Sequence, residues 1–175
     1  MNKKNLAPRI LAVAIAGVLL PSAFVSGRAA YRLLTGVEYA QPLEKHRVIP
    51  PAIVHLQSGA AVPLGAMLAD TSVIILFSTS CSSCFAEADA WEELAAESGA
   101  NVAFVALAQN ASLSQLESFT SRSGAVRYAR IDESTRKRLQ GVGLPTIYVL
   151  DEVKTVQFAA VGPTATEDLK RWFRD

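Results

Sequence analysis

Apolar residues follow two alternating patterns along the chain: continuous runs, and recurrence at helical spacing. The runs predict β-strands, and those at residues 72–77 and 101–107 are apolar enough to be buried on both faces of a sheet. Further strands are predicted at residues 126–131, 146–150 and 155–160. Two shorter apolar segments, residues 52–56 and 61–64, lie on either side of Ser58-Gly59 and predict a hairpin.

Helical spacing predicts helices between these strands, at residues 81–97, 112–121 and 133–139, and from residue 164 to the C-terminal end. The second helix begins with Ser112 and Gln115, which have the spacing of a capping box. Thr164 and Glu167 have the same spacing and are expected to begin the last helix.

The alternation of strand and helix predicts an α/β fold in which helices flank both faces of a central mixed sheet. The hairpin formed by the last two strands makes the sheet mixed, because hairpin strands are antiparallel. Trp91 and Trp172 lie at core positions of their helices and are expected to pack in the interior. With 175 residues, the chain is long enough for one domain and a short appendage.

Residues 1–27 have the layout of a targeting segment. Lys3, Lys4 and Arg9 precede an apolar run at residues 10–20, and small residues follow it. This layout predicts a cleaved signal peptide or, as the alternative, an uncleaved membrane anchor, because the uncharged stretch after Arg9 is 18 residues long. Both alternatives place the remaining chain outside the cytoplasm, since the basic residues stay inside.

The rest of the chain divides into a connector and a domain. Residues 28–50 are predicted to be a connector, because they lack a sustained period and end near Pro50-Pro51. The domain is expected over residues 51–175. Lys and Arg number 17 against 16 Asp and Glu, so a nucleic-acid partner is not expected. Without residues 1–27 the chain has 14 Lys and Arg against 16 Asp and Glu, and this mildly acidic balance suits a domain with protein partners.

The candidate chemistry lies at Cys81-Ser82-Ser83-Cys84, which follows the strand at residues 72–77 and begins the next helix. Unpaired backbone N–H groups and the helix dipole favour a thiolate there, so we expect a lowered pKa for Cys81. The spacing lets Cys84 reach Cys81 and form a disulfide. We therefore expect Cys81 to be the exposed attacking thiol and Cys84 the more buried resolving thiol.

Two alternatives to redox chemistry are weaker. A structural zinc site needs four ligands, and the histidines of the chain, His46 and His55, lie in the connector and the first strand. An inert structural disulfide is disfavoured because so short a loop constrains the unfolded chain little. We expect no metal site and no bound cofactor.

The order of strand, Cys-x-x-Cys motif and helix resembles thioredoxin-like proteins, more closely the extracytoplasmic thiol–disulfide oxidoreductases of the TlpA/ResA type. The resemblance covers about residues 52–175 and includes residues 141–146, which are similar to the family's cis-proline segment. It implies a cis peptide bond before Pro145 and contact of Leu144 and Pro145 with the substrate. The alternative is a trans proline that opens a strand.

Other positions follow or depart from the pattern of this family. Gly162 matches a glycine that follows the last hairpin, and the long spacing between the motif and the proline implies an inserted strand and helix within residues 101–131. The chain departs from the family pattern at four positions. Ile75 stands where the family places a buried acid and Ser80 where it places a tryptophan, and Phe85 replaces a basic residue and Asp89 a proline. Glu87 matches an acid frequent in the TlpA-like group and could carry protons to or from the thiols. Its alternative is a solvated carboxylate alongside Asp89, Glu92 and Glu93.

The resemblance implies a thiol–disulfide oxidoreductase that exchanges the Cys81–Cys84 pair with exported proteins that contain cysteines. Its expected task is the reduction of a disulfide during maturation of an exported protein, such as an apocytochrome or a periplasmic enzyme, with electrons from a membrane partner. The alternative is a binding module or chaperone that keeps the fold without redox turnover. The expected location is periplasmic or otherwise extracytoplasmic.

Overall fold

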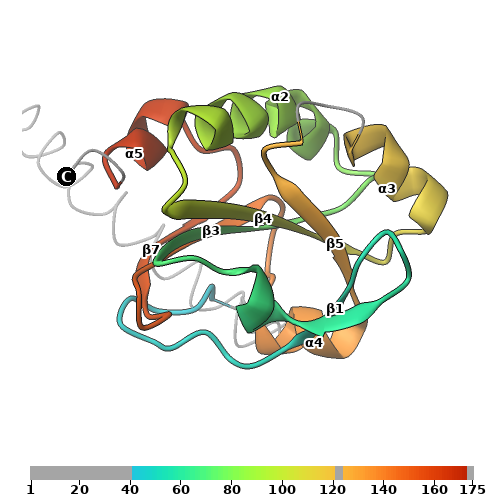
Figure 1. The fold of residues 1–175 in the computed structure, drawn as a ribbon, viewed down its shortest axis with the longest axis horizontal. Helices are drawn as coiled ribbons and strands as arrows, with labels where there is room; N and C mark the ends of the chain where they lie inside the picture. The colour runs from blue at the N-terminus through green and yellow to red at the C-terminus, as the bar shows by residue number, and fades with distance from the viewer. Residues whose placement is uncertain (1–40, 121–123, 173–175) are drawn as a thin grey trace, which may run out of the picture. The chain divides into compact units, whose positions relative to one another are not determined.

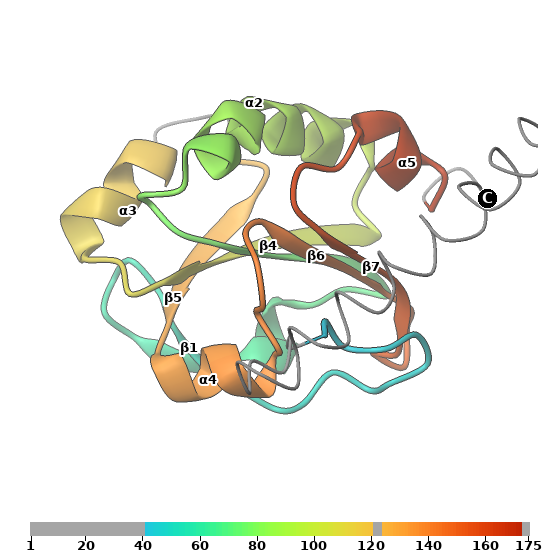
Figure 2. The same ribbon diagram turned by 180° about the vertical axis from the view of Figure 1, so that it is seen from behind.

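A central sheet of seven strands is flanked by helices on both faces (Figures 1 and 2). The computed structural model describes residues 41–120 and 124–172. In chain order the elements are β1 (Ile53–His55), β2 (Ala61–Pro63), the 3₁₀ helix η2 (Leu64–Met67), β3 (Thr71–Phe77), α2 (Ser82–Glu97), β4 (Val102–Gln109), α3 (Leu113–Thr120), β5 (Arg127–Ile131), α4 (Glu133–Arg138), β6 (Thr146–Leu150), β7 (Val156–Val161) and α5 (Thr166–Lys170). The predicted strands and hairpin are confirmed, although the hairpin ends at Pro63 because Leu64 begins η2.

The strand order in the sheet is β2-β1-β5-β4-β3-β6-β7. The three central strands β5, β4 and β3 run parallel, whereas β6 and β7 on one side and β1 and β2 on the other are antiparallel to their neighbours. The sheet is therefore mixed, as predicted. Strand β3 lies in the interior of the sheet, between β4 and β6, where helices can cover both of its faces.

Side chains of β3 point alternately into two hydrophobic clusters, one on each face of the sheet. Val73, Ile75 and Phe77 pack on the face covered by α2, α3 and α5, whereas Ile74 and Leu76 pack on the face that carries α4 and η2. Each of these side chains is almost completely buried, which contributes about 1.5–3 kcal/mol per residue to stability. This two-sided burial explains why the strand is a continuous apolar run rather than an alternating one.

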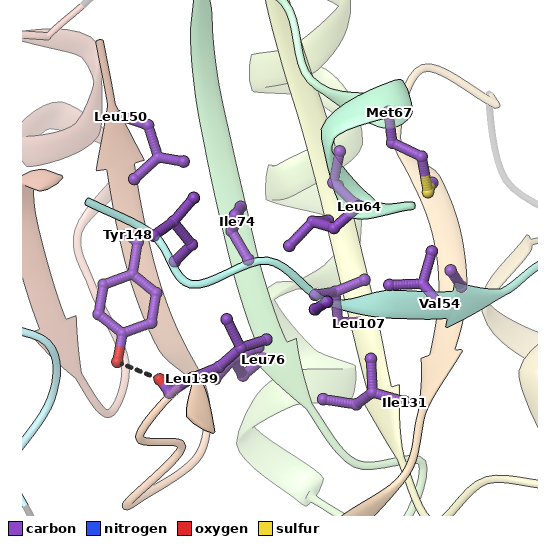
Figure 3. Close-up of a cluster of buried hydrophobic side chains, with 14 of the residues drawn as sticks. Val54, Leu64, Met67, Ile74, Leu76, Leu107, Ile131, Leu139, Tyr148 and Leu150 are labelled. Carbon is purple, nitrogen blue, oxygen red and sulfur yellow. Dashed lines mark hydrogen bonds between the residues drawn. The ribbon is translucent and has the colours of Figure 1, made fainter. Parts of the chain in front are cut away.

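Tyr148 joins β6 to two segments on the α4 face. Its hydroxyl donates a hydrogen bond to the carbonyl oxygen of Leu139 at 2.8 Å (Figure 3). The hydroxyl oxygen of Tyr148 also accepts a hydrogen bond from the backbone N–H of Leu43 at 3.1 Å. Burial raises the pKa of Tyr148 to about 12, so this hydroxyl keeps its proton at physiological pH.

Residues 43–49 pack against the domain, although they belong to the stretch expected as a connector. Leu43 and Ile49 are buried in the cluster on the α4 face. The backbone N–H of His46 donates to the carbonyl of Val156 at 2.7 Å, and the backbone N–H of Ile49 donates to the carbonyl of Lys154 at 2.9 Å. Because these contacts use backbone groups and only two buried side chains, they leave no periodic pattern in the sequence.

The expected signal peptide or anchor at residues 1–27 lies outside the described residues. Within residues 41–120 and 124–172, no helix is long and apolar enough to cross a membrane.

One of the two predicted capping boxes is confirmed and the other is wrong. Ser112 and Gln115 exchange hydrogen bonds, since the Ser112 N–H donates to Gln115 Oε1 at 2.9 Å and the Gln115 N–H donates to Ser112 Oγ at 3.2 Å. The last helix begins at Thr166 with Ala165 as its N-cap, and no side chain caps it. Thr164 lies one residue before the N-cap, and its hydroxyl donates to the carbonyl of Gly162 at 3.2 Å.

The two tryptophans differ in burial. Trp91 is 2% exposed, so its predicted packing role is confirmed. Trp172 is 38% exposed, because α5 ends at Lys170 and Trp172 lies beyond the helix. Its ring packs against Phe158 with centroids 5.8 Å apart. Phe173, expected on the same helix, lies outside the described residues.

Candidate active site

Cys81 and Cys84 are joined by a disulfide at the start of α2, with their Cα atoms 5.3 Å apart. Cys81 is the N-cap residue and has extended backbone angles, so the helix begins immediately after it. Its backbone is held on both sides, because its N–H donates to the carbonyl of Ser78 at 3.1 Å and its carbonyl accepts from the N–H of Phe85 at 3.1 Å. The local backbone therefore fixes where the Cys81 sulfur lies.

The two sulfurs have different surroundings. Cys84 is completely buried in the cluster beneath α2, whereas Cys81 is only partly buried. The Sγ of Cys81 accepts a hydrogen bond from the backbone N–H of Cys84 at 3.2 Å. This N–H is one of the groups that the first turn of a helix leaves without a helical partner, and such groups favour negative charge.

The loop before β6 lies at the same end of the sheet as the disulfide. The register pairs Leu76, near the end of β3, with Thr146, the first residue of β6, so Pro145 lies beside the strand that leads to Cys81. The Leu144–Pro145 peptide bond is cis, as the resemblance implies. Leu144 is partly buried and contacts the clusters on both faces of the sheet.

Gly162 holds this loop from the end of β7. Its backbone N–H donates to the carbonyl of Pro145 at 2.7 Å. Its φ of 90° lies in the region that favours glycine, because a Cβ would strain the backbone there. The glycine that the family resemblance singled out therefore supports the proline loop directly.

Glu87 lies one helical turn after Cys84 and connects α2 to the segment that precedes α5. Its carboxylate accepts hydrogen bonds from the Trp91 side chain and from the backbone N–H of Thr164. Its Oε2 is buried and has no hydrogen-bond partner among the described residues. Burial raises the pKa of Glu87, and this effect outweighs the two hydrogen bonds, which lower it. Glu87 is thus not a fully solvated helix carboxylate.

The raised pKa of Glu87 predicts a stability effect that depends on pH. The folded protein binds this proton more tightly than the unfolded chain, whose ordinary value is 4.5, so the stabilisation is present below that pH and is lost as pH rises through the folded value. We expect wild type to lose stability relative to Glu87→Gln between pH 4 and pH 7 in urea unfolding. Glu93→Gln, at an exposed position of the same helix, is the matched control. If the free energies of unfolding of wild type and Glu87→Gln differed by the same amount at every pH, the prediction would be contradicted.

Of the four positions that depart from the family pattern, Ile75, Ser80 and Phe85 carry no charge, whereas Asp89 is an exposed carboxylate on α2. Ile75 is completely buried on the α2 face, in the same cluster as Cys84. The hydroxyls of Ser78 and Ser80 lie 2.9 Å apart in the loop before Cys81. Phe85 is 53% exposed, and its ring packs edge-on against Phe119 with centroids 5.6 Å apart. Among the described residues, no group of three or more His, Cys, Asp or Glu could hold a metal ion.

Glu92 is a buried structural residue that sequence reasoning missed, because it was grouped with the solvated carboxylates of the helix. It is 4% exposed. Its Oε2 accepts hydrogen bonds from the backbone N–H groups of Ala125 and Val126, at 2.9 and 3.2 Å. These N–H groups lie just before β5, so Glu92 ties α2 to the start of that strand.

Replacing Glu92 should therefore cost stability. Glu92→Ala leaves two backbone N–H groups without their side-chain acceptor, and we expect a loss of about 2–4 kcal/mol in the free energy of unfolding, measured in urea. Glu93→Ala, at the exposed neighbouring position, should change it by less than about 0.5 kcal/mol. Equal effects of the two substitutions would show that Glu92 contributes only as a helix residue.

Comparison with known proteins identifies the fold. No family model and no curated protein sequence matches the chain. A secreted disulfide oxidoreductase of Mycobacterium tuberculosis homologous to E. coli DsbE is similar in structure, with a TM-score of 0.58, 19% identity, and coverage of 68% of this chain and 91% of that one. A thiol:disulfide interchange protein of the thioredoxin family from Chlorobium tepidum has a TM-score of 0.61, 18% identity, and coverage of 75% and 95%.

A third similar structure is the thioredoxin domain of a thiol-disulfide oxidoreductase from Bacteroides vulgatus, with a TM-score of 0.63, 11% identity, and coverage of 75% and 99%. The chain spans nearly the whole length of all three proteins. The mixed sheet, the Cys-x-x-Cys disulfide at the start of α2 and the cis-proline loop are therefore set in a thioredoxin-like fold.

Proposed function

We propose that the protein is a thiol–disulfide oxidoreductase that exchanges the Cys81–Cys84 pair with cysteines of exported proteins. The observation that carries the proposal is the unequal placement of the two sulfurs. Cys81 is accessible at the N-cap of α2, and Cys84 is completely buried behind it. An accessible thiolate can attack a client, whereas a buried neighbour can resolve the resulting complex without competing for the client.

In the reducing direction, the Cys81 thiolate attacks one sulfur of a client disulfide and forms a mixed disulfide. The other client sulfur leaves as a thiolate and takes a proton from solvent. Cys84 then loses its proton and attacks the Sγ of Cys81, which releases the first client sulfur as a second thiolate. Two electrons pass from the dithiol to the client, and the Cys81–Cys84 disulfide remains. A dithiol donor must reduce it before the next cycle.

Glu87 is our candidate for the group that accepts the Cys84 proton. The two residues are three positions apart on α2 and so lie on the same side of the helix. A carboxyl whose pKa is raised by burial exchanges protons closer to neutral pH than an exposed one does. We assign client binding to Leu144 and Pro145, whose loop lies beside the end of β3 and can offer backbone groups to an extended segment.

The expected leader and the fold support a role outside the cytoplasm. Residues 1–27 have the layout of a signal peptide or an anchor, and one of the similar structures is a secreted disulfide oxidoreductase. We infer that the protein acts as a reductase during maturation of an exported protein, such as an apocytochrome or a periplasmic enzyme. A membrane partner would supply the electrons that restore the dithiol, and no bound cofactor is needed for this chemistry.

Insulin reduction with dithiothreitol as the electron source tests the redox proposal. We expect wild type to accelerate the precipitation of reduced insulin, and Cys81→Ala to lower the rate to that of dithiothreitol alone, because the attacking sulfur is gone. Circular dichroism of the variant would show that it is folded. Equal rates for folded wild type and Cys81→Ala would favour the alternative, a binding module or chaperone without redox turnover.

A further inference from the structure

The two serines between the cysteines differ in what their hydroxyls contact. Ser83 Oγ lies 3.2 Å from the Sγ of Cys81 and is partly buried. Ser82 is exposed, and within the described residues its hydroxyl makes no hydrogen bond. The pair therefore contains one hydroxyl directed at the attacking sulfur and one that faces solvent.

The direction of the Ser83 hydrogen bond follows from the disulfide. A disulfide sulfur carries no hydrogen, so the Ser83 hydroxyl is the donor and the Sγ of Cys81 is the acceptor. The backbone N–H of Cys84 donates to the same sulfur at 3.2 Å. Two donors thus converge on Cys81 Sγ.

This arrangement does not depend on the disulfide bond to hold Cys81 in place. The backbone of Cys81 is bonded to the carbonyl of Ser78 and to the N–H of Phe85, and Ser83 belongs to the first turn of α2. We therefore expect the same two donors to remain near the sulfur in the reduced protein. A hydrogen bond to a charged acceptor is about twice as strong as one to a neutral acceptor, so both donors favour the thiolate.

We propose that Ser83 is a positioning residue whose hydroxyl stabilises the Cys81 thiolate, so that it sets both the reactivity and the redox poise of the site. The proposal rests on the proposed thiol–disulfide exchange and assigns this role to Ser83 and not to Ser82. Stabilising the thiolate stabilises the reduced protein relative to the disulfide, and it makes Cys81 a better leaving group when a client is oxidised.

The test compares Ser83→Ala, Ser83→Thr and the matched control Ser82→Ala with wild type, in the otherwise complete chain. Two quantities are measured: the pKa of Cys81, from the pH dependence of alkylation of the reduced protein, and the equilibrium constant with glutathione. For Ser83→Ala we expect the pKa of Cys81 to rise by about 0.5–1 unit. The equilibrium should move about threefold to tenfold toward the disulfide form, which corresponds to a potential lower by about 15–30 mV.

Ser83→Thr keeps a hydroxyl on the same carbon and should restore both quantities, and Ser82→Ala should leave both as in wild type. A Ser83→Ala protein with the pKa and equilibrium constant of wild type would overturn the proposal. So would equal changes in Ser82→Ala and Ser83→Ala, because they would indicate a general effect of the first turn. Insulin reduction by wild type reports separately on the proposed function, so failure of the Ser83 role and failure of redox turnover give different results.

Discussion

Alkylation of the reduced protein with iodoacetamide at pH 7 should modify Cys81 at least about 100-fold faster than Cys84. Cys81 is only partly buried at the helix N-terminus, whereas Cys84 is completely buried and can react only after local opening of α2. The rate at Cys81 should titrate with a pKa well below the unperturbed value of about 8.5. Mass spectrometry of quenched samples measures both sites in one experiment.

The single-cysteine variants serve as controls for this prediction. Cys81→Ser contains Cys84 as its one thiol. We expect iodoacetamide to alkylate this thiol slowly while the protein is folded and rapidly in urea. Cys84→Ser should keep the fast reaction of Cys81. Equal rates at the two thiols of the folded protein, both with an unshifted titration, would remove the division into attacking and resolving sulfur.

The sequence was sufficient for features whose partners lie close together along the chain. Cys81 and Cys84 could be assigned because an apolar strand, a short loop and a helix follow one another within a few residues. Ser112 and Gln115 form their capping box because they lie three positions apart at the start of α3, where each side chain reaches the backbone N–H of the other. Thr164 has the same spacing to an acid, but the helix begins at Thr166, and spacing alone does not show at which residue a helix starts.

Features that depend on distant partners could not be predicted. Glu92 accepts hydrogen bonds from Ala125 and Val126, which are 33 and 34 positions away, so its sequence neighbourhood shows only an acidic helix. Leu43 donates to the Tyr148 hydroxyl across 105 positions, and this contact ties a segment without periodicity to the domain. The position of Pro145 beside the strand before Cys81 came from family resemblance, because strand pairing is not visible in local sequence.

Trapping of clients should separate the two cysteines by their roles in exchange. Cys84→Ser deletes the step in which Cys84 attacks the Sγ of Cys81, while it keeps the N-cap residue and its backbone hydrogen bonds. The mixed disulfide between Cys81 and a client then has no internal route to resolution. We expect Cys84→Ser, expressed with its native leader, to accumulate covalent adducts with exported proteins, and Cys81→Ser to accumulate few.

The most direct measurement of thiol–disulfide exchange by Cys81 is therefore mass spectrometry of adducts purified with Cys84→Ser under non-reducing conditions. We expect adducts that disappear on reduction and in which Cys81 is linked to a cysteine of an exported protein; their identities would name the client and the electron donor. Wild type and Cys81→Ser, expressed at the same level, provide the comparison. The absence of adducts from both variants, each exported and folded, would contradict the oxidoreductase account.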